Sequence, residues 1–390
     1  MFSMTRKLSI FCILLILLFY GWAKPSLGQI PEEVKQSALR LGKLLGPKLT
    51  PNPPDWATPN APVLFSFAWL TDMHLHEANE NRMAQTLRWI DQELKPTFLL
   101  LTGDNSALVP SGSVGADPAA RNLRRQQYLQ QWLAEHWKRP YAIVPGDNWP
   151  GEFDRVFGPR QYRIACGGLH LLLLAPDRMH HGPGLEGLSA FDPETLDWLR
   201  RDLEKYREHP TLVAIHEPIY PPTFVDAPPI RNILRDHPQV LGVLQGHLHI
   251  DMQLRDGRQV YLVGPAVGPG LPPAFKLVQV YRHIMIIRTS EWNLKTGRWH
   301  LVAKWQKIDI PEALQTPLQP VEGGGQTTAD PSAGAGWPGR EKPLQMVSFR
   351  PARPVRDDPA LARRAGELLE AIRQFLWKES PKLLLEAGGR

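Results

Sequence analysis

Short apolar runs alternate with amphipathic stretches through the middle of the chain. Runs that predict buried strands span residues 63–70, 98–101, 141–144, 162–165, 169–174, 212–215 and 240–244. Stretches with helical periodicity lie between them at 81–94, 119–137 and 193–207. Continuous apolar strands joined by helices predict an α/β fold whose sheets are buried on both faces. Strand patterns alone continue from 260 to 305, so an antiparallel portion is expected to close this domain, which spans 63–308.

The N-terminal residues show a different pattern, one that is typical of export. Arg6 and Lys7 precede an uncharged run at 8–23, and the small residues Ser26 and Gly28 follow it. A positive start, an apolar run shorter than the ~20 residues of a membrane span and small residues after it predict a signal peptide at 1–28. The alternative is an uncleaved N-terminal anchor, the only feature that would hold the protein at a membrane. Both place the remaining chain in the periplasm, outside the cell or at the cell surface.

The segments that flank the central domain are rich in proline and glycine. Residues 29–62 combine a weak helical pattern with a proline-rich linker, and residues 309–357 predict a second linker. Residues 358–390 predict an amphipathic helix that docks on the central domain, with partner binding as the alternative. Its apolar side is expected to comprise Leu361, Ala365, Leu368, Leu369, Ile372, Phe375 and Leu376.

Charge and cysteine content exclude some classes of protein. The formal net charge of +6 would fall to +3 on loss of Arg6, Lys7 and Lys24, and no basic run with interleaved aromatic residues indicates nucleic-acid binding. Cys12 lies in the N-terminal apolar run, so the mature chain is expected to form no internal disulfide. Cys166 follows a predicted strand, and we expect a buried small hydrophobic residue there rather than a nucleophile.

Five short motifs come directly after predicted strands. They are Thr71-Asp72-Met73-His74, Gly103-Asp104-Asn105, Pro145-Gly146-Asp147-Asn148, His216-Glu217-Pro218 and Gly246-His247-Leu248-His249. An open α/β sheet binds ligands beyond the carboxyl ends of its strands, so these motifs are expected to converge. A single strand-end Asp is commonly a turn or capping residue, and a single His is commonly structural. The occurrence of all five together indicates a functional site.

The residue types in these motifs predict a metal centre. Asp and neutral His are ligands for Mn, Fe and Zn, and the motifs contain no thiolate. In Asp72-x-His74 and His247-x-His249, alternate side chains of an extended segment point to the same side. Glycines before two of the ligands permit a sharp change of backbone direction. A site with this many ligands is expected to hold two divalent metal ions about 3.5–4 Å apart, which would clamp a phosphate.

In the order of these motifs, residues 65–251 resemble the calcineurin-like metallophosphoesterases. That family has Asp-x-His, Gly-Asp, Gly-Asn-His-Asp/Glu, His and Gly-His-x-His in this order, and four of the five blocks match directly. The resemblance implies an α/β fold of the βαββα type, a sandwich of two mixed sheets flanked by helices. It also implies the ligands: Asp72, His74 and His249 for the first metal, His216 and His247 for the second, Asp104 bridging both, and Asp147 in the place of an Asn ligand.

The third motif departs from the family pattern. Asn148 stands where the family has a catalytic His, which is thought to stabilise the phosphate or protonate the leaving group. Asn donates hydrogen bonds but supplies no proton at neutral pH. His76, two residues beyond His74, is our first candidate for the missing group, and His180 and His181 are the others.

These observations favour an exported hydrolase of small phosphorylated substrates, either a phosphodiesterase or a phosphomonoesterase. A metal-bound hydroxide would attack phosphorus, with His247 and Asn148 near the phosphate. The main alternative is a non-catalytic descendant that binds metal or phosphorylated ligands, and a weaker one is a hydrolase of non-phosphate bonds. The absence of a Tyr at Ala107 argues against an iron site of the purple acid phosphatase type. Loops at 107–121, 178–187 and 220–229 are expected to select the substrate.

Overall fold

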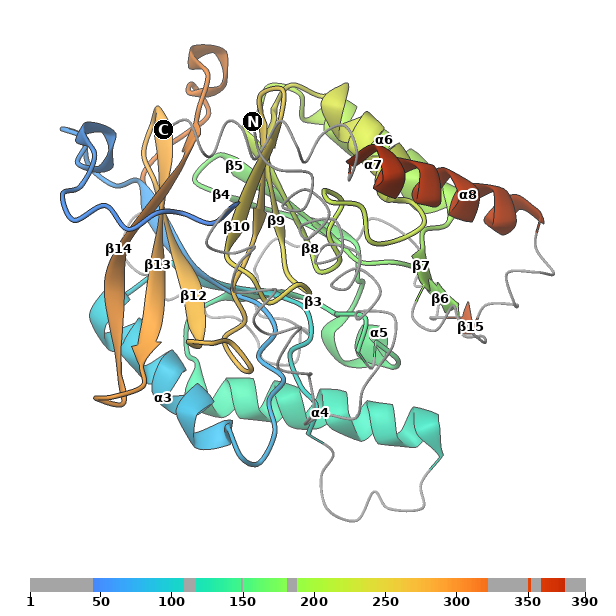
Figure 1. Ribbon diagram of the computed structural model, residues 1–390, viewed down its shortest axis with the longest axis horizontal. Coiled ribbons are helices and arrows are strands. Elements are labelled where there is room, and N and C mark those ends of the chain that lie inside the picture. The colour runs from blue at the N-terminus through green and yellow to red at the C-terminus, as the bar shows by residue number, and fades with distance from the viewer. Residues whose placement is uncertain are drawn as a thin grey trace, which may run out of the picture.

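Two six-stranded sheets face each other across an apolar core, as Figure 1 shows. This computed structural model describes residues 45–108, 117–148, 150–180, 188–321, 350–351 and 359–375. The predicted signal peptide, the helical pattern before residue 45 and most of the linker after residue 321 lie outside these ranges. Both sheets are mixed and helices flank them, which confirms the predicted α/β sandwich.

The first sheet has the strand order β14-β13-β12-β1-β2-β3. Its strands are β1 (Phe65–Leu70), β2 (Phe98–Thr102), β3 (Tyr141–Val144), β12 (Ala274–Val280), β13 (Ile284–Asn293) and β14 (Arg298–Asp309). β1, β2 and β3 run parallel, so the three motifs that follow them leave the sheet at the same edge. β12, β13 and β14 form the antiparallel portion that the sequence predicts.

The second sheet has the strand order β10-β11-β9-β8-β5-β4. Its strands are β4 (Tyr162–Cys166), β5 (Leu169–Leu174), β8 (Thr211–Ile215), β9 (Val240–Gln245), β10 (Met252–Asp256) and β11 (Gln259–Val263). β8 and β9 are parallel neighbours, so the two remaining motifs also leave together. A small third sheet pairs β6 (Arg178–His180) with β7 (Leu188–Ala190) and β15 (Arg350–Pro351).

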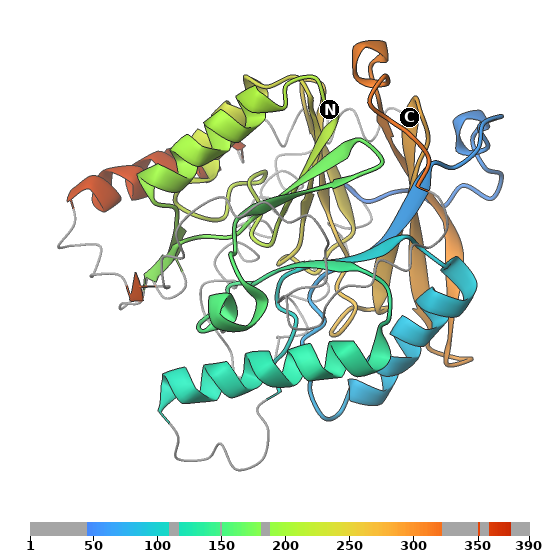
Figure 2. The ribbon, with the colours of Figure 1, turned by 180° about the vertical axis from the view of Figure 1, so that it is seen from behind.

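Helices cover the outer face of each sheet (Figures 1 and 2). The first sheet carries α3 (Glu80–Trp89) with its π-helical continuation η2 (Ile90–Leu94), α4 (Pro118–His136) and α5 (Phe153–Phe157). The second carries α6 (Pro193–Lys205), α7 (Ala227–Arg235) and α8 (Pro359–Gln374). The 3-10 turns η1 (Asp55–Ala57) and η3 (Glu312–Leu314) come before and after the two sheets in sequence. Buried residues of both sheets, such as Phe67 and Leu171, form the core between them.

The sequence pattern does not predict α7. This helix begins at Ala227, inside the segment 220–229 that we expected to be a loop. Pro228 and Pro229 obscure it, although proline is well tolerated in the first turn of a helix. Asp192 precedes α6 as expected, but its side chain makes no capping hydrogen bond. It forms an ion pair with Arg178 instead, with 2.5 Å between Nη2 and Oδ1.

Cys166 ends β4 and is buried, as the sequence predicts. Burial raises the pKa of its thiol to about 12, so the reactive thiolate is scarce at neutral pH. Among the described helices, none combines the length and apolar character that crossing a bilayer requires.

The C-terminal helix α8 docks on the central domain beside α7. Leu368, Ile372 and Phe375 are buried in the cluster that covers the second sheet, and the Phe375 ring meets Tyr220 edge-on, with 5.1 Å between centroids. Arg364 donates to the buried carboxylate of Asp226 at 2.9 Å. Leu369, which the helical pattern places on the apolar side, is 55% exposed.

Replacing Phe375, the largest of these buried side chains, is expected to weaken the packing of α8 on the central domain. Phe375→Ala should lower the free energy of unfolding by about 3 kcal/mol or more, because a large buried ring leaves a cavity. Urea unfolding measures this loss, and hydrogen exchange should show faster exchange in α8. Leu369→Ala is the matched control and should change stability by less than about 0.5 kcal/mol. Equal effects of the two substitutions would contradict the described docking.

Candidate metal centre

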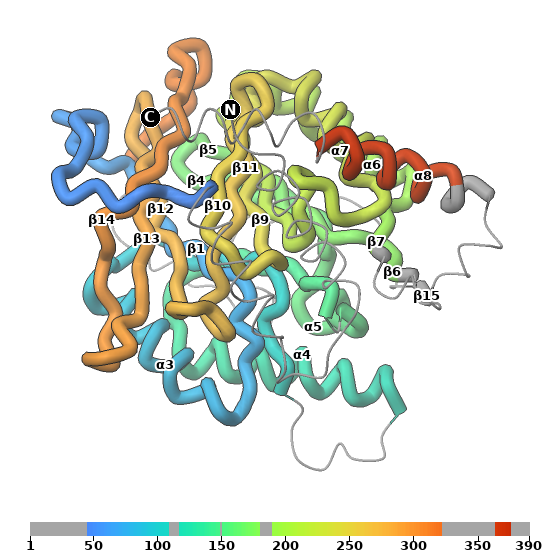
Figure 3. Tube along the Cα trace, in the orientation of Figure 1, coloured from blue at the N-terminus to red at the C-terminus, as the bar shows by residue number. Residues whose placement is uncertain are grey.

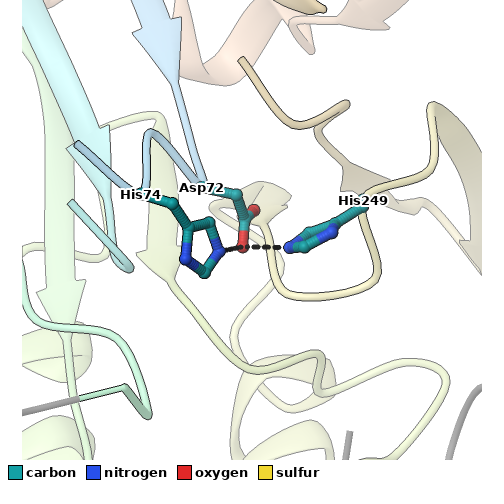
Figure 4. Close-up of side chains that lie close together, drawn as sticks. All are labelled: Asp72, His74 and His249. Carbon is teal, nitrogen blue, oxygen red and sulfur yellow. Dashed lines mark hydrogen bonds and ion pairs between the residues drawn. The ribbon is translucent and has the colours of Figure 1, made fainter. Parts of the chain in front are cut away.

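The first group of predicted ligands comes from the segments that follow β1 and β9. Asp72, His74 and His249 lie close enough for their ligand atoms to surround one ion, as Figure 4 shows. His249 Nε2 is 3.1 Å from Asp72 Oδ1, and His74 Nε2 is 3.9 Å from the same oxygen. Asp72 is fully buried, whereas the His249 side chain is 29% exposed. The group therefore has a buried end and an open end.

The second group comes from the segments that directly follow β3, β8 and β9. Asp147 Oδ1 lies 3.0 Å from His216 Nε2 and 3.1 Å from His247 Nδ1. All three residues offer ligand atoms within 4.8 Å of one another. The structure therefore brings together the residues that the sequence assigns to a second ion.

Asp104, at the end of β2, lies between the two groups. Its Oδ2 is 3.4 Å from His74 Nε2 of the first group, and its Oδ1 is 3.5 Å from His216 Nε2 of the second. One carboxylate that faces both groups has the geometry of a bridging ligand. All seven predicted metal ligands thus converge on one place at the edge of the two sheets.

The charge state of these residues suits a metal centre. Burial alone would raise the pKa of Asp72, but His249, His216 and His74 outweigh it and hold that pKa well below its usual range. Burial would likewise raise the pKa of Asp147, but His247 and His216 hold it well below its usual value. Carboxylates that are ionised at neutral pH are the form that binds metal ions.

Protonated imidazoles balance the negative charge of these carboxylates. Burial would lower the pKa of His247, yet Asp147 raises it to about 9. Asp104 and Asp72 likewise raise the pKa of His216 well above its usual value, against the effect of its burial. In the metal-free chain these protons balance the carboxylates, and metal ions would replace them.

One buried nitrogen supports the same assignment. His74 Nε2 makes no hydrogen bond with any of the residues that the structure describes. A buried polar atom without a partner is costly, and a metal ion would satisfy it. The set of three carboxylates and four imidazoles is typical of Mn, Fe or Zn.

Backbone strain concentrates at these ligands. Within the described ranges, the non-glycine residues with positive φ are Asp72, His74, Lys95, Asp104, Glu152, His247 and His249. Five of these seven are predicted metal ligands. Such conformations cost about 1–3 kcal/mol each and persist only where the surrounding structure enforces them. No sequence pattern reveals this strain.

The glycines before the ligands are required by close contacts. A Cβ at Gly146 would lie 2.0 Å from Asp104 Oδ1, and one at Gly246 would lie 2.0 Å from Thr71 Oγ1. Gly103 has a φ of +96°, and a Cβ there would lie 2.5 Å from the His216 ring. The glycines therefore let neighbouring motifs approach each other.

The sequence predicts Asn148 near the phosphate and offers His76, His180 and His181 as candidates for the missing catalytic group. Asn148 does lie at the centre, but it donates to Asp104 from its backbone N–H at 2.9 Å and from its side-chain amide as well. His76 is exposed, and its Nδ1 lies 2.6 Å from the backbone oxygen of His74. The side chains of His180 and His181 lie outside the described part.

Three neighbours of the centre received no role from the sequence pattern, although Thr71 and Glu217 stand within two of the five motifs. Thr71 donates to Asp72 Oδ2 at 2.7 Å. Gly268, in a segment rich in glycine and proline after β11, donates its N–H to the backbone oxygen of Asp72 at 3.0 Å. Glu217 is buried, and its burial, together with Asp147, raises its pKa to about 7. For Gly268, the glycine–proline segment itself was the visible signal in the sequence, because close approach of two backbones requires small residues.

An added methyl group should displace the bridging carboxylate. Gly146→Ala is expected to lower the affinity for Mn²⁺ by at least about 10-fold, since Asp104 must move to make room. Isothermal titration calorimetry measures this change. Gly366→Ala is the control, because a Cβ there meets nothing within 4 Å. Unchanged Mn²⁺ affinity in Gly146→Ala would count against the described centre.

Comparison with known proteins agrees with this geometry. Residues 65–251 match the model of a family described as calcineurin-like phosphoesterase. A 3′,5′-cyclic-nucleotide phosphodiesterase from Nostoc sp. is 27% identical over 232 residues, which cover 53% of this chain and 80% of that protein. A dimetal phosphatase from Danio rerio superposes with a TM-score of 0.50 at 12% identity, over 64% of this chain and 99% of that one. The likeness to the Danio rerio structure supports the fold alone.

Proposed function

Because residues 65–251 match the model of the calcineurin-like phosphoesterase family, we propose that this chain is a member of that family and hydrolyses phosphoric esters with two divalent metal ions. The convergence of two ligand groups on Asp104 carries this proposal. Two ions held there would polarise a phosphoryl group and lower the pKa of a water molecule to near neutrality. Mn, Fe and Zn all suit the ligands.

The exposure of the ligands indicates where a substrate would approach. The side chains of Asp72 and His216 are 0% and 1% exposed, whereas that of His249 is 29% exposed and that of His247 is 11% exposed. A phosphate would therefore enter beside His249 and His247. The carboxylates below them keep the ligand set in place and carry no direct contact to the substrate in this proposal.

A phosphodiester is the substrate that we favour. The Nostoc relative is named as a phosphodiesterase, and this supports a diester for our chain. Asn148 supplies no proton to a leaving group, and the exposed His76 does not face the ligands through any described contact. The proposed reaction therefore depends on the metal ions and is fastest for esters with good leaving groups.

A second function is favoured by Asn148 itself. Where the family pattern has a catalytic His, this residue binds the bridging carboxylate instead. A protein of this kind would bind metal ions and phosphorylated ligands without turnover. Assays of metal binding and of hydrolysis on the same preparation separate the two functions.

We propose further that the protein is exported. The uncharged run at 8–23 after Arg6 and Lys7 supports this location. Sequencing the N-terminus of the protein purified from its native host tests the proposal, because cleavage near Gly28 is expected. An intact start recovered from the cytoplasm would contradict it.

Loss of the bridging carboxylate should remove activity. With added Mn²⁺, the unmodified protein is expected to hydrolyse bis-p-nitrophenyl phosphate and 3′,5′-cyclic AMP, and Asp104→Asn should lower kcat/KM by at least about 100-fold. The exposed Asp309→Asn is the matched control and should keep full activity. Bound Mn²⁺ without turnover of any ester in the unmodified protein would favour the binding function.

Asn148→Ala separates a role in positioning Asp104 from a hydrogen bond to the leaving group. If the amide serves to hold Asp104, the substitution lowers kcat/KM by a similar factor for aryl diesters with good and with poor leaving groups. It should also lower Mn²⁺ affinity by about 10-fold. Rates across a series of substituted phenyl esters measure the first effect. A loss that grows with the pKa of the leaving group would instead indicate that the amide donates a hydrogen bond to the leaving-group oxygen.

A further inference from the structure

Lys276 is a charged residue in the middle of β12 and is completely buried. Lysine is almost never fully buried without partners. Its ammonium group donates three hydrogen bonds, to Asp251 Oδ1 at 2.6 Å, Thr289 Oγ1 at 2.8 Å and Gln306 Oε1 at 2.7 Å. These bonds use all three donors of the group.

The partners join the two sheets. Lys276, Thr289 and Gln306 belong to β12, β13 and β14 of the first sheet, whereas Asp251 immediately precedes β10 of the second. In Figure 3, β10 lies next to β12, with β13 and β14 on the far side of β12. Thr289 also donates to Asp251 Oδ2 at 3.0 Å. Both carboxylate oxygens of Asp251 are therefore held from the opposite sheet.

Asp251 stands two residues beyond a proposed metal ligand. Leu248 and Ile250 are buried in the apolar cluster on the outer face of the second sheet. The alternate residues His247, His249 and Asp251 contact Asp147, Asp72 and Lys276, in that order. The segment thus has an apolar side that packs on the domain and a polar side that faces the centre and the first sheet.

This segment is strained and held at both ends. His247 and His249 have φ values of +68° and +57°, a conformation that side chains with a Cβ rarely adopt. At its start, Gly246 donates its N–H to the backbone oxygen of His216 at 2.8 Å. At its end, the described polar attachment is the Asp251 contact with Lys276 and Thr289. The next residue, Met252, pairs with Val263 of β11, so without the Asp251 contact β10 stays in place and the turn around His249 is free to relax away from Asp72.

We propose that Lys276 positions His249 for the first metal ion through Asp251, with Thr289 completing the contact. A buried ion pair adds little to stability compared with apolar residues of similar size, so its effect here is geometric. It allows one location for Asp251 and thereby one for His249. The inference rests on the proposed metal function and concerns the Asp72–His74–His249 group alone.

Lys276→Met tests this role, because the Mn²⁺ affinity of each of the two ligand groups can be measured separately. Calorimetric titration with Mn²⁺ should show two ions bound to the unmodified chain. In the variant, affinity at one site should fall by about 10–100-fold, as for other residues that orient a ligand, while the other site stays unchanged. Electron paramagnetic resonance should show the signal of a spin-coupled Mn²⁺ pair replaced by that of an isolated ion at sub-saturating metal.

Two further variants keep the test decisive. Thr289→Val retains both charges and the side-chain volume, and it should weaken the same site to a smaller extent if Lys276→Met fails to fold. Arg163→Met removes another largely buried ion pair, between Arg163 on β4 and Asp202 on α6. β4 and β10 lie at opposite edges of the second sheet. Arg163→Met should lower thermal stability and leave both Mn²⁺ affinities unchanged.

The outcomes distinguish this inference from the proposed function. An unmodified chain that binds no Mn²⁺ overturns the proposed function and this inference with it. Two ions bound with unchanged affinities in the unmodified chain, Lys276→Met and Thr289→Val overturn the positioning role alone. Equal weakening of both sites in Lys276→Met, matched by Arg163→Met, also overturns it, because the effect is then one of general stability.

Discussion

Three buried carboxylates, those of Asp72, Asp104 and Asp147, share one small volume where the two sheets end. Like charges repel strongly away from water, so the group persists only with positive charge beside it. In the metal-free chain, protonated imidazoles such as that of His216 supply this charge. Two divalent ions would do so more completely. The need to balance these carboxylates is the constraint on which the site's architecture depends.

The backbone around the centre is organised to meet this constraint. Five predicted ligands adopt positive φ values, and glycines beside them make room for neighbouring motifs. Such local strain is stable only because two large sheets, with a common core and helices on their outer faces, hold the strand ends rigidly. The Lys276–Asp251 contact extends this support to the most exposed ligand, His249.

The same geometry defines the chemistry. Asn148 stands where the family pattern has a catalytic His. It donates two hydrogen bonds to Asp104 and so holds a proposed metal ligand in place. His76 lies at the surface and does not replace the missing acid through any described contact. The proposed hydrolysis therefore relies on the metal ions and on the stability of the leaving group.

The sequence alone predicted seven of the strands to within two residues, a strand-rich antiparallel portion after them, the order of the five motifs and the seven residues that the structure brings together as candidate metal ligands. These follow from local rules, since a buried strand is a short apolar run and the ligands come directly after it. Only the tertiary structure decided that Asn148 faces Asp104, that His76 faces outward and that Lys276 is held by Asp251. It also revealed α7, which two prolines conceal. Contacts such as that of His249 with Asp72 join residues 177 positions apart, and their geometry depends on how the two sheets pack and not on any local pattern.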